Sequence, residues 1–508
     1  MTNLSLTLRE AAQMYPDRPA LRLDSTVFTY AQLDDLSACV AGWLRERGLQ
    51  PGDPVGLMLP NVPHFPVFYY GVLRAGGAIV PMNPLLKARE VAHYLGDSGA
   101  RLVLAWETFA DEAAAGAETA GATAVTISPA TMRDVATWTP SREVVPRADD
   151  DTAVILYTSG TTGTPKGAEL THANMRKNAS VIATTMLDLG PDDVVMGCLP
   201  LFHSFGQTCG LNAAVMSGAC LTLIPRFTPA AALEVIERDQ VTVFEGVPTM
   251  YVGMLGEAGG SADTSSLRLC VSGGAALPVE VLHGFEKAFD AVILEGYGLS
   301  ETSPVATFNR RDNRKPGSIG VPIEGVQLTL LAVDDDGGEV PVTEAGGIGE
   351  IAIRGHNVMK GYRNRPEATA AAMRGGWFRT GDLATVDEDG FYYIVDRKKD
   401  MVIRGGYNVY PREIEEVLYE HPAVLEAAVI GIPHPSLGEE VGAAVTLRPG
   451  AVCTPQELRD YVKERVAAYK YPRHVWLTDG LPKGPTGKLL KREITIPADV
   501  LSATGGQS

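Results

Sequence analysis

Cysteine is scarce in this chain of 508 residues, and none of its six cysteines forms a CxxC pair. No histidine lies at metal-ligand spacing from any of them, which disfavours a zinc site built on thiolates. We interpret the cysteines as small buried hydrophobic residues of a protein in a reducing compartment. The sequence also lacks any run of 18 uninterrupted apolar residues, so it predicts no membrane-spanning helix.

Positive charge is in deficit as well. The chain has 44 Lys and Arg residues against 61 Asp and Glu residues, a net charge of −17. This balance disfavours general nucleic-acid binding and attraction to anionic membranes, so an anionic ligand would be held by local charge. The first residues lack the basic and apolar regions of a signal peptide. We therefore expect a soluble, cytoplasmic protein that acts on small molecules, and the sequence leaves a homodimer open.

Short apolar runs alternate with amphipathic segments through most of the chain. Residues 35–49 and 64–77 are typical of helices. The runs that predict strands are 55–60, 78–83, 101–106, 122–128, 220–225, 241–248, 267–274 and 291–298. Strict alternation of strand and helix predicts an α/β fold with layered, mainly parallel sheets.

A second, smaller unit is predicted near residue 396. The strand 391–397 is followed by the charged residues KKD, and the pattern then restarts with a helix at 411–422. Strands at 425–433, 441–449 and 474–478 and a helix at 454–469 complete a set that suits a small α/β domain. The sequence thus predicts a large N-terminal domain, 1–396, and a small C-terminal domain, 397–508.

The segment YTSGTTGTPKG, residues 157–167, contains glycine, serine and threonine but only one large side chain, Tyr157. It follows the apolar run 153–157 and precedes a predicted helix at 171–186, with Thr171 as its N-cap. A strand, a Gly-rich loop and a helix aim backbone N–H groups at phosphate. The loop lacks the GxxxxGK[ST] pattern of a Walker A motif. An ordinary surface loop would have the same composition, so the two interpretations stay open at this point.

Five further segments occur in a fixed order: LPLFHSFG (199–206), GYGLSET (296–302), WFRTGD (377–382), DRKKDMVIRGGYNVYPREIEE (396–416) and PKGPTGKLLKRE (482–493). With the Gly-rich segment, they resemble the motifs of the adenylate-forming (AMP-binding) superfamily of acyl-CoA synthetases, adenylation domains and luciferases. The resemblance covers essentially the whole chain. It implies ATP-dependent activation of a carboxylic acid, in which catalysis is mainly positioning and charge neutralisation.

The resemblance also implies roles for individual residues. Thr158 and Glu301 would hold Mg²⁺, and Glu301 would also be catalytic. Tyr297 would stack on adenine, and Asp382 and Arg397 would bind the ribose hydroxyls. The nucleotide would further be bound by the loop residues Ser159, Gly160, Thr161, Thr162, Gly163 and Lys166, and by Gly274, Ala275, Glu295, Gly296, Gly298, Ser300 and Thr302.

Lys488 matches the catalytic lysine of the PTGK motif, and it would reach between the substrate carboxylate and the α-phosphate. A basic tail offers another interpretation, because charge runs are usually solvated. The resemblance further implies that the C-terminal domain is mobile and rotates between two half-reactions about a hinge at Lys399. The face around Gly405, Gly406 and Tyr407 would then admit CoA.

The identity of the acid is less constrained. No acidic residue follows His203 in SFGQTCGLN to pair with an amino group, and Gly296 stands where family members that bind diacids have arginine. We therefore expect a medium- or long-chain fatty acid, with a cinnamate- or benzoate-type aryl acid as the alternative. His203 either gates the substrate or only packs. Transfer to a carrier protein instead of CoA, and a catalytically silent nucleotide sensor, are the competing hypotheses.

Overall fold

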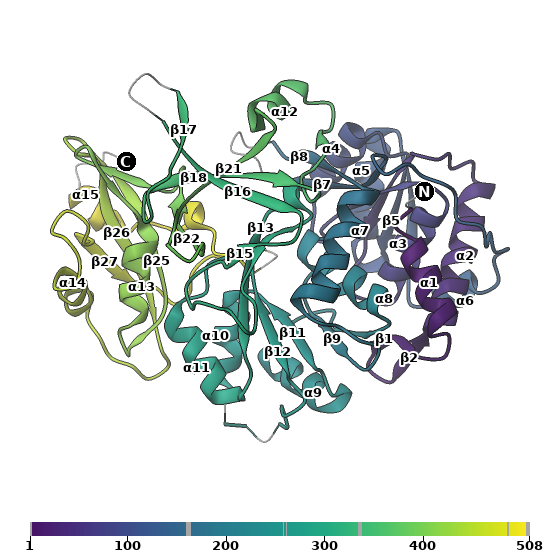
Figure 1. The fold of residues 1–508 in the computed structure, drawn as a ribbon, viewed down its shortest axis with the longest axis horizontal. Coiled ribbons are helices and arrows are strands. Elements are labelled where there is room, and N and C mark those ends of the chain that lie inside the picture. Colours follow the sequence, from purple (N-terminus) through teal and green to yellow (C-terminus); the bar gives the residue numbers. More distant parts are fainter. Residues whose placement is uncertain are drawn as a thin grey trace.

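A computed structural model of the protein describes residues 3–158, 164–257, 259–260, 262–333, 338–484 and 487–503. Within these residues, strands form four sheets. Figure 1 shows the N-terminal part of the chain in purple and blue, the middle in teal and green, and the C-terminal unit in yellow-green at the opposite end. The α/β fold class predicted from the sequence is confirmed.

The first sheet has nine strands and is parallel through its centre. Several of its strands are completely buried runs, as expected for parallel strands that are covered by helices on both faces. In spatial order the strands are β15 (Val321–Pro322), β14 (Val305–Phe308), β13 (Ile293–Gly298), β12 (Leu269–Ser272), β11 (Val243–Gly246), β9 (Val194–Gly197), β10 (Cys220–Leu223), β1 (Pro19–Leu23) and β2 (Thr26–Thr29).

The second sheet has seven strands. It is parallel from β7 to β6, whereas β8 and β19 join its edge in antiparallel fashion. The strands, in order, are β19 (Gly361–Tyr362), β8 (Lys166–Thr171), β7 (Thr152–Thr158), β4 (Ala78–Pro81), β3 (Pro54–Met58), β5 (Leu102–Trp106) and β6 (Thr123–Ile127).

The third sheet is antiparallel throughout, which the predicted alternation of strands and helices did not indicate. In this part of the chain the strands follow one another with few helices between them. They are β17 (Glu339–Pro341), β16 (Val326–Val333), β18 (Gly349–Gly355), β21 (Trp377–Val386) and β20 (Met373–Arg374), with β22 (Tyr392–Arg397) beside β21.

The C-terminal unit contains the fourth sheet and its own hydrophobic cores on both faces of that sheet. An independent core is the mark of a domain. The strands are β24 (Tyr407–Val409), β23 (Val402–Arg404), β26 (Gly438–Leu447) and β25 (Val424–His434), with β27 (His474–Leu477) parallel to β26. A boundary between residues 396 and 397 stays a prediction.

Helices cover the sheets, and threonines begin several of them. Thr29, Thr171 and Thr454 form capping boxes with the residue three positions later. The α-helices are α1 (Leu6–Met14), α2 (Tyr30–Glu46), α3 (His64–Arg74), α4 (Ala88–Ser98), α5 (Ala110–Ala120), α6 (Thr131–Val135), α7 (His172–Val181), α8 (Ala213–Ser217), α9 (Pro229–Asp239), α10 (Pro248–Gly256), α11 (Val279–Phe289), α12 (Pro366–Ala372), α13 (Pro411–Tyr419), α14 (Pro455–Lys463) and α15 (Ala498–Ala503).

Shorter helical segments complete the fold. Two are π-helical, η2 (Ile182–Met186) and η3 (Gly206–Asn212), and such segments are frequent at functional sites. Three are 3₁₀-helical, η1 (Glu107–Phe109), η4 (Ser300–Thr302) and η5 (Lys491–Glu493). Among the described residues, no helix is both long and apolar enough to cross a membrane.

Candidate active site

Lys488 reaches from the C-terminal domain into the N-terminal domain. A Cβ atom built on Gly274, at the turn after β12, would lie 3.1 Å from Lys488 Cε and 3.7 Å from its Nζ. Burial lowers the pKa of Lys488 to about 8, and Arg397 acts in the same direction, whereas Asp382 and Glu301 oppose the shift. Lys488 is therefore not a solvated lysine of a basic tail, because it is buried near Arg397, Asp382 and Glu301, three of the residues predicted to bind the nucleotide or its metal ion.

The loop that carries Lys488 is docked through the residue before it. Gly487 has φ +77°, and its carbonyl accepts a hydrogen bond of 3.0 Å from Thr249 Oγ1 at the start of α10. A Cβ atom at this position would lie 2.9 Å from Thr249 Oγ1 and 3.0 Å from Val247 Cγ2. Two separate features favour glycine at this position: the left-handed backbone and the close approach of the two domains.

Asp382 joins two other predicted residues. Its Oδ2 accepts a hydrogen bond of 2.6 Å from the hydroxyl of Tyr297, and its Oδ1 lies 3.4 Å from Arg397 Nε. The register of β21 on β22 places Asp382 directly opposite Arg397. Burial raises the pKa of Asp382, and Arg397 is the first group that opposes this shift. The carboxylate, the phenol and the guanidinium thus form one polar group beside Lys488.

Glu301 and Thr158, the predicted Mg²⁺ ligands, are in direct contact. Thr158 Oγ1 donates to Glu301 Oε1 at 3.2 Å, although the two residues come from β7 and η4. The hydroxyl of Tyr362 donates to the same carboxylate oxygen at 2.9 Å. A hydroxyl beside a buried carboxylate is an oxygen donor set that a hard cation prefers.

Lys166 lies at the other end of the Gly-rich segment, opposite Thr158 in the β7–β8 pairing. Its Nζ lies 5.3 Å from the ring centroid of Tyr362, the residue that also contacts Glu301. At the start of the segment, Tyr157 stacks on Tyr94 with a centroid distance of 4.1 Å. Both ends of the segment are therefore fixed next to Glu301, whereas Ser159, Gly160, Thr161, Thr162 and Gly163 lie outside the described residues.

The local structure after this segment differs from the prediction. A helix was expected directly after the loop, but the antiparallel strand β8 comes first, and α7 begins only after it. The first N–H groups of α7 are already used, since His172 and Ala173 donate to the carbonyls of Asp151 and Asp149, and Asn174 donates to the predicted N-cap Thr171. β7 and β8 thus pair as an antiparallel hairpin, and phosphate binding at the N-terminus of α7 is not supported.

His203 stands at the start of the helical turn that leads into η3. Its Nδ1 accepts a hydrogen bond of 3.3 Å from the backbone N–H of Phe205. Burial lowers the pKa of His203 to about 3, and the charge of Lys488 acts in the same direction. The imidazole is therefore neutral at physiological pH, and with Nδ1 as acceptor its proton is on Nε2, where it can donate to a ligand.

The remaining nucleotide-site predictions fall around β13 and η4. Glu295 is buried, and burial raises its pKa to about 7. A Cβ atom on Gly298 would lie 1.8 Å from the carbonyl oxygen of Pro304, so this glycine permits a close backbone approach. The hydroxyl of Thr302 accepts from the N–H of Leu299 and therefore stabilises the loop itself. Ser300 and Gly296 are partly buried in the same segment, and Ala275 is exposed next to Gly274.

The residues predicted to admit CoA are not part of this group. Gly405 and Gly406 form the turn between β23 and β24, with φ of +57° and +87°. The N–H of Gly405 donates to Leu437 at 2.8 Å, and Tyr407 stacks on Tyr469, so these contacts stay inside the C-terminal domain. Lys399 follows β22 between the two domains, and burial lowers its pKa.

Two residues that complete the site were not predicted from the sequence. Tyr362 contacts both Glu301 and Lys166, but it belongs to a two-residue strand that exists only because β8 pairs with it. Thr249 holds the loop of Lys488 from a distant part of the chain. Both roles depend on contacts between segments far apart in sequence, and no local pattern predicts such contacts.

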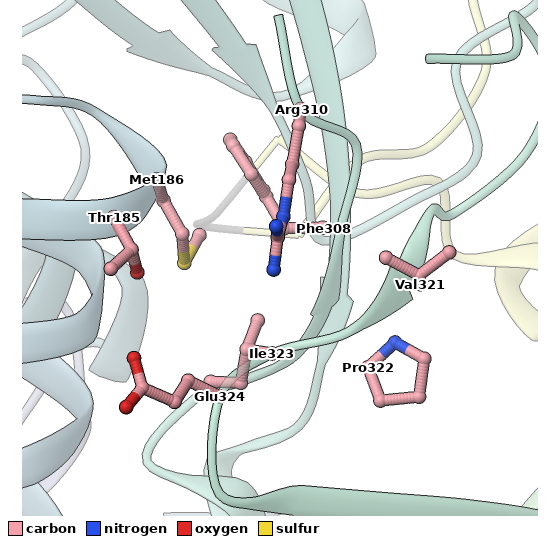
Figure 2. A pocket seen from close by; sticks show the side chains of 8 residues that line it. All are labelled: Thr185, Met186, Phe308, Arg310, Val321, Pro322, Ile323 and Glu324. Carbon is pink, nitrogen blue, oxygen red and sulfur yellow. The ribbon is translucent and has the colours of Figure 1, made fainter. Parts of the chain in front are cut away.

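A small hollow lies behind Gly296. Figure 2 shows Phe308 and Arg310 facing Met186 of η2 across it, with Ile323 and Glu324 below. Phe308 separates this hollow from β13, since its ring would lie 2.7 Å from a Cβ atom on Gly296. None of the residues predicted to be catalytic is part of its lining.

Comparison with known proteins identifies the family of the chain. The family model described as "AMP-binding enzyme" matches residues 8–363. The model described as "AMP-binding enzyme C-terminal domain" matches residues 413–488. The chain belongs to the AMP-binding enzyme family. The resemblance inferred from the motifs is confirmed, and the chain is an enzyme of the acyl-CoA synthetase class, as predicted.

Three relatives of this family member cover nearly all of it. A long-chain-fatty-acid–CoA ligase of Bacillus subtilis (strain 168) is 37% identical over 97% of this chain and 94% of its own length. A feruloyl-CoA synthase of an Amycolatopsis species is 39% identical over 95% and 96%. A crystal structure of a benzoate CoA ligase from Burkholderia xenovorans LB400 has a TM-score of 0.89 and 30% identity, with 97% and 99% covered.

Proposed function

We propose that this family member is an ATP-dependent carboxylic acid–CoA ligase that works in two steps through an acyl-adenylate. The observation that carries the proposal is the position of Lys488, which enters the N-terminal domain beside Gly274. There it lies close enough to Asp382 and Glu301 for both carboxylates to raise its pKa against the effect of burial. An ammonium group flanked by nucleotide-binding carboxylates suits a reaction in which two anions must meet.

In the first step, a carboxylate oxygen of the acid attacks the α-phosphorus of ATP. The bond from that phosphorus to the bridging oxygen of the β-phosphate breaks, and pyrophosphate leaves. Lys488 would neutralise charge on the carboxylate and the α-phosphate, and His203 would donate from Nε2 to the acid. Asp382 and Arg397 would hold the ribose hydroxyls, and Tyr297, which is fixed on Asp382, would lie against adenine.

A divalent cation would be held by Thr158 and Glu301, whose oxygens already lie 3.2 Å apart. When bound, Mg²⁺ would neutralise phosphate charge. Lys166 would supply a second positive charge at the end of the Gly-rich segment. Tyr362 would orient the carboxylate of Glu301 through its hydrogen bond of 2.9 Å.

In the second step, the thiol sulfur of CoA attacks the acyl carbon, and AMP leaves with the electron pair of the broken C–O bond. Rotation of the C-terminal domain about Lys399 would withdraw Lys488 and present the turn Gly405–Gly406 with Tyr407 to CoA. Tyr407 is 59% exposed in the present arrangement, which leaves this face accessible. One active site would thereby use two faces of one domain in turn.

The acid that we propose is a medium- or long-chain fatty acid. The long-chain-fatty-acid–CoA ligase of Bacillus subtilis supports this choice. Gly296 and Gly273 do not add to it, because the rings of Phe308 and Phe205 would lie 2.7 Å and 3.0 Å from Cβ atoms built on them. An aryl acid is the second candidate, because a feruloyl-CoA synthase is similar over almost the whole chain.

The test is pyrophosphate release with Mg-ATP and CoA across a panel of acids, from acetate to palmitate, with cinnamate, benzoate and malonate. We expect turnover that depends on CoA and is greatest among the alkyl acids. A maximum at an aryl acid would replace the substrate and keep the mechanism. Transfer only to a phosphopantetheinyl carrier protein would replace the acceptor. No release with any acid would refute the ligase function.

A further inference from the structure

Several buried polar side chains near the site have atoms without a hydrogen-bond partner, and Gln207 and Glu245 are the largest that the candidate site does not already use. Gln207 is 0% exposed, and neither its Oε1 nor its Nε2 has a partner. Glu245 is 1% exposed, and its Oε1 has none. Buried polar atoms in folded proteins are nearly always satisfied, so each exception needs an explanation, and a ligand is one.

Glu245 lies on β11, which leads toward the loop that carries Lys488. Val247, two residues later, contacts that loop, since its Cγ atoms lie 3.5 Å from a Cβ atom built on Gly274 and 3.0 Å from one built on Gly487. A strand advances about 3.3 Å per residue and returns to the same side every second residue. The carboxyl of Glu245 therefore faces the same side as Val247, about 7 Å farther from Lys488.

Gln207 extends from the other wall. It lies one helical turn after His203, and its backbone N–H donates to the His203 carbonyl at 3.0 Å. On the same segment, a Cβ atom built on Gly210 would lie 3.5 Å from Glu245 Oε2. The π-helix η3 and strand β11 thus pack together at Gly210 and Glu245, and both lead inward from His203 and Lys488.

The chemistry of Glu245 fits a polar partner. Burial raises its pKa to about 8, so the group is mainly a neutral carboxylic acid at pH 7, which both donates and accepts hydrogen bonds. The carboxamide of Gln207 also does both. Leucine would fill the same volumes without leaving polar atoms unsatisfied, and packing alone therefore does not account for either residue.

We propose that Glu245 and Gln207 hydrogen-bond an oxygen function on the acyl group, so that the enzyme prefers a hydroxylated acid over the matched acid without the hydroxyl. This inference rests on the proposed acid–CoA ligase function and specifies its substrate. It applies to an alkyl or an aryl skeleton, because it concerns only the polar group that lies beyond the carboxylate.

The experiment compares kcat/KM for matched acids in the full-length protein with Mg-ATP and CoA. The pairs are decanoate and 10-hydroxydecanoate, cinnamate and 4-hydroxycinnamate, and benzoate and 4-hydroxybenzoate. For at least one pair we expect a preference of about tenfold or more for the hydroxylated acid, because a site built for a hydroxyl rejects the analogue that lacks it. Glu245→Leu and Gln207→Leu should each reduce that preference about tenfold while retaining activity on the plain acid.

Glu245→Gln is the matched control. It preserves size and hydrogen bonding, and we expect it to keep the preference. Wild-type activity without a preference in any pair would overturn the inference, as would a preference that survives both leucine variants; the ligase function would stand in either case. No activity on any acid would instead refute the proposed function itself. Should Glu245→Leu not fold, the Gln207→Leu result decides.

Discussion

The C-terminal domain presents two glycine turns in opposite situations. Gly487 is pressed against Thr249 and Val247 of the other domain, and the lysine after it is drawn into the site. Gly405 and Gly406 have the same left-handed backbone, but their neighbours belong to their own domain and Tyr407 is exposed. In this arrangement the domain offers only the Gly487 turn to the site, and the second half-reaction that we propose requires the Gly405–Gly406 turn to take its place.

The largest effect should come from the docked turn. We expect Lys488→Ala to lower the rate of adenylate formation about 10²–10³-fold, because a charge aimed at the reacting anions is lost. Thioester formation from supplied acyl-AMP should be spared. Pyrophosphate exchange and acyl-AMP turnover measure the two steps separately. Lys483→Ala is the control, since Lys483 lies in the same segment but pairs with Glu426 at 2.7 Å. Equal loss of both steps would refute the two-face mechanism.

A hinge variant should produce the reverse pattern. Proline fixes φ near −65°, so Lys399→Pro should prevent the backbone change that a rotation requires. We expect adenylation to stay within a few-fold of wild type and the thioester step to fall about 10-fold or more. Lys399→Ala removes the same side chain without fixing the backbone and should keep both steps. If the proline variant retained both rates, the hinge would lie elsewhere.

The protonation of Lys488 should be visible in the pH dependence of the docked state. Its pKa is lowered to about 8, and the protonated form is the one that neutralises the substrates. In the free enzyme, kcat/KM for adenylation should therefore fall as the pH rises through about 8. Lys488→Arg keeps its charge at higher pH. The activity that Lys488→Arg retains should not decline in this pH range. If the variant showed the same decline as the wild type, the titrating group would be a residue other than Lys488.

The smallest effect should come from the hydrogen bond that docks the turn. Thr249→Val removes the donor to the Gly487 carbonyl but keeps the shape of the side chain. A single neutral hydrogen bond contributes about 0.5–1.5 kcal/mol, which corresponds to a decrease of about 2–10-fold in adenylation. Thioester formation from acyl-AMP should not decrease. A parallel loss in both half-reactions would mean that Thr249 stabilises the N-terminal domain rather than the docked turn.

Much of the fold was predictable from local patterns. The apolar runs at 153–157 and 267–274 became β7 and β12, and Thr171 caps α7 as expected. Strand β8 was missed, because KGAELT has no apolar run and becomes a strand through its pairing with β7. The antiparallel third sheet was missed for a related reason, since the direction of pairing is set by tertiary contacts.

The sequence by itself determined the α/β class, the family and most of the candidate site residues, because glycine turns and charged motifs depend on local chemistry. Only the tertiary structure decided which of them meet. It brought Lys488 to Gly274 and Thr158 to Glu301, and it kept Tyr407 apart. It also left Glu245 and Gln207 buried with polar atoms unsatisfied. The amino-acid sequence alone shows neither the burial of a side chain nor the partners that distant segments supply. Burial and partners together determine the pKa values and hydrogen bonds of a site.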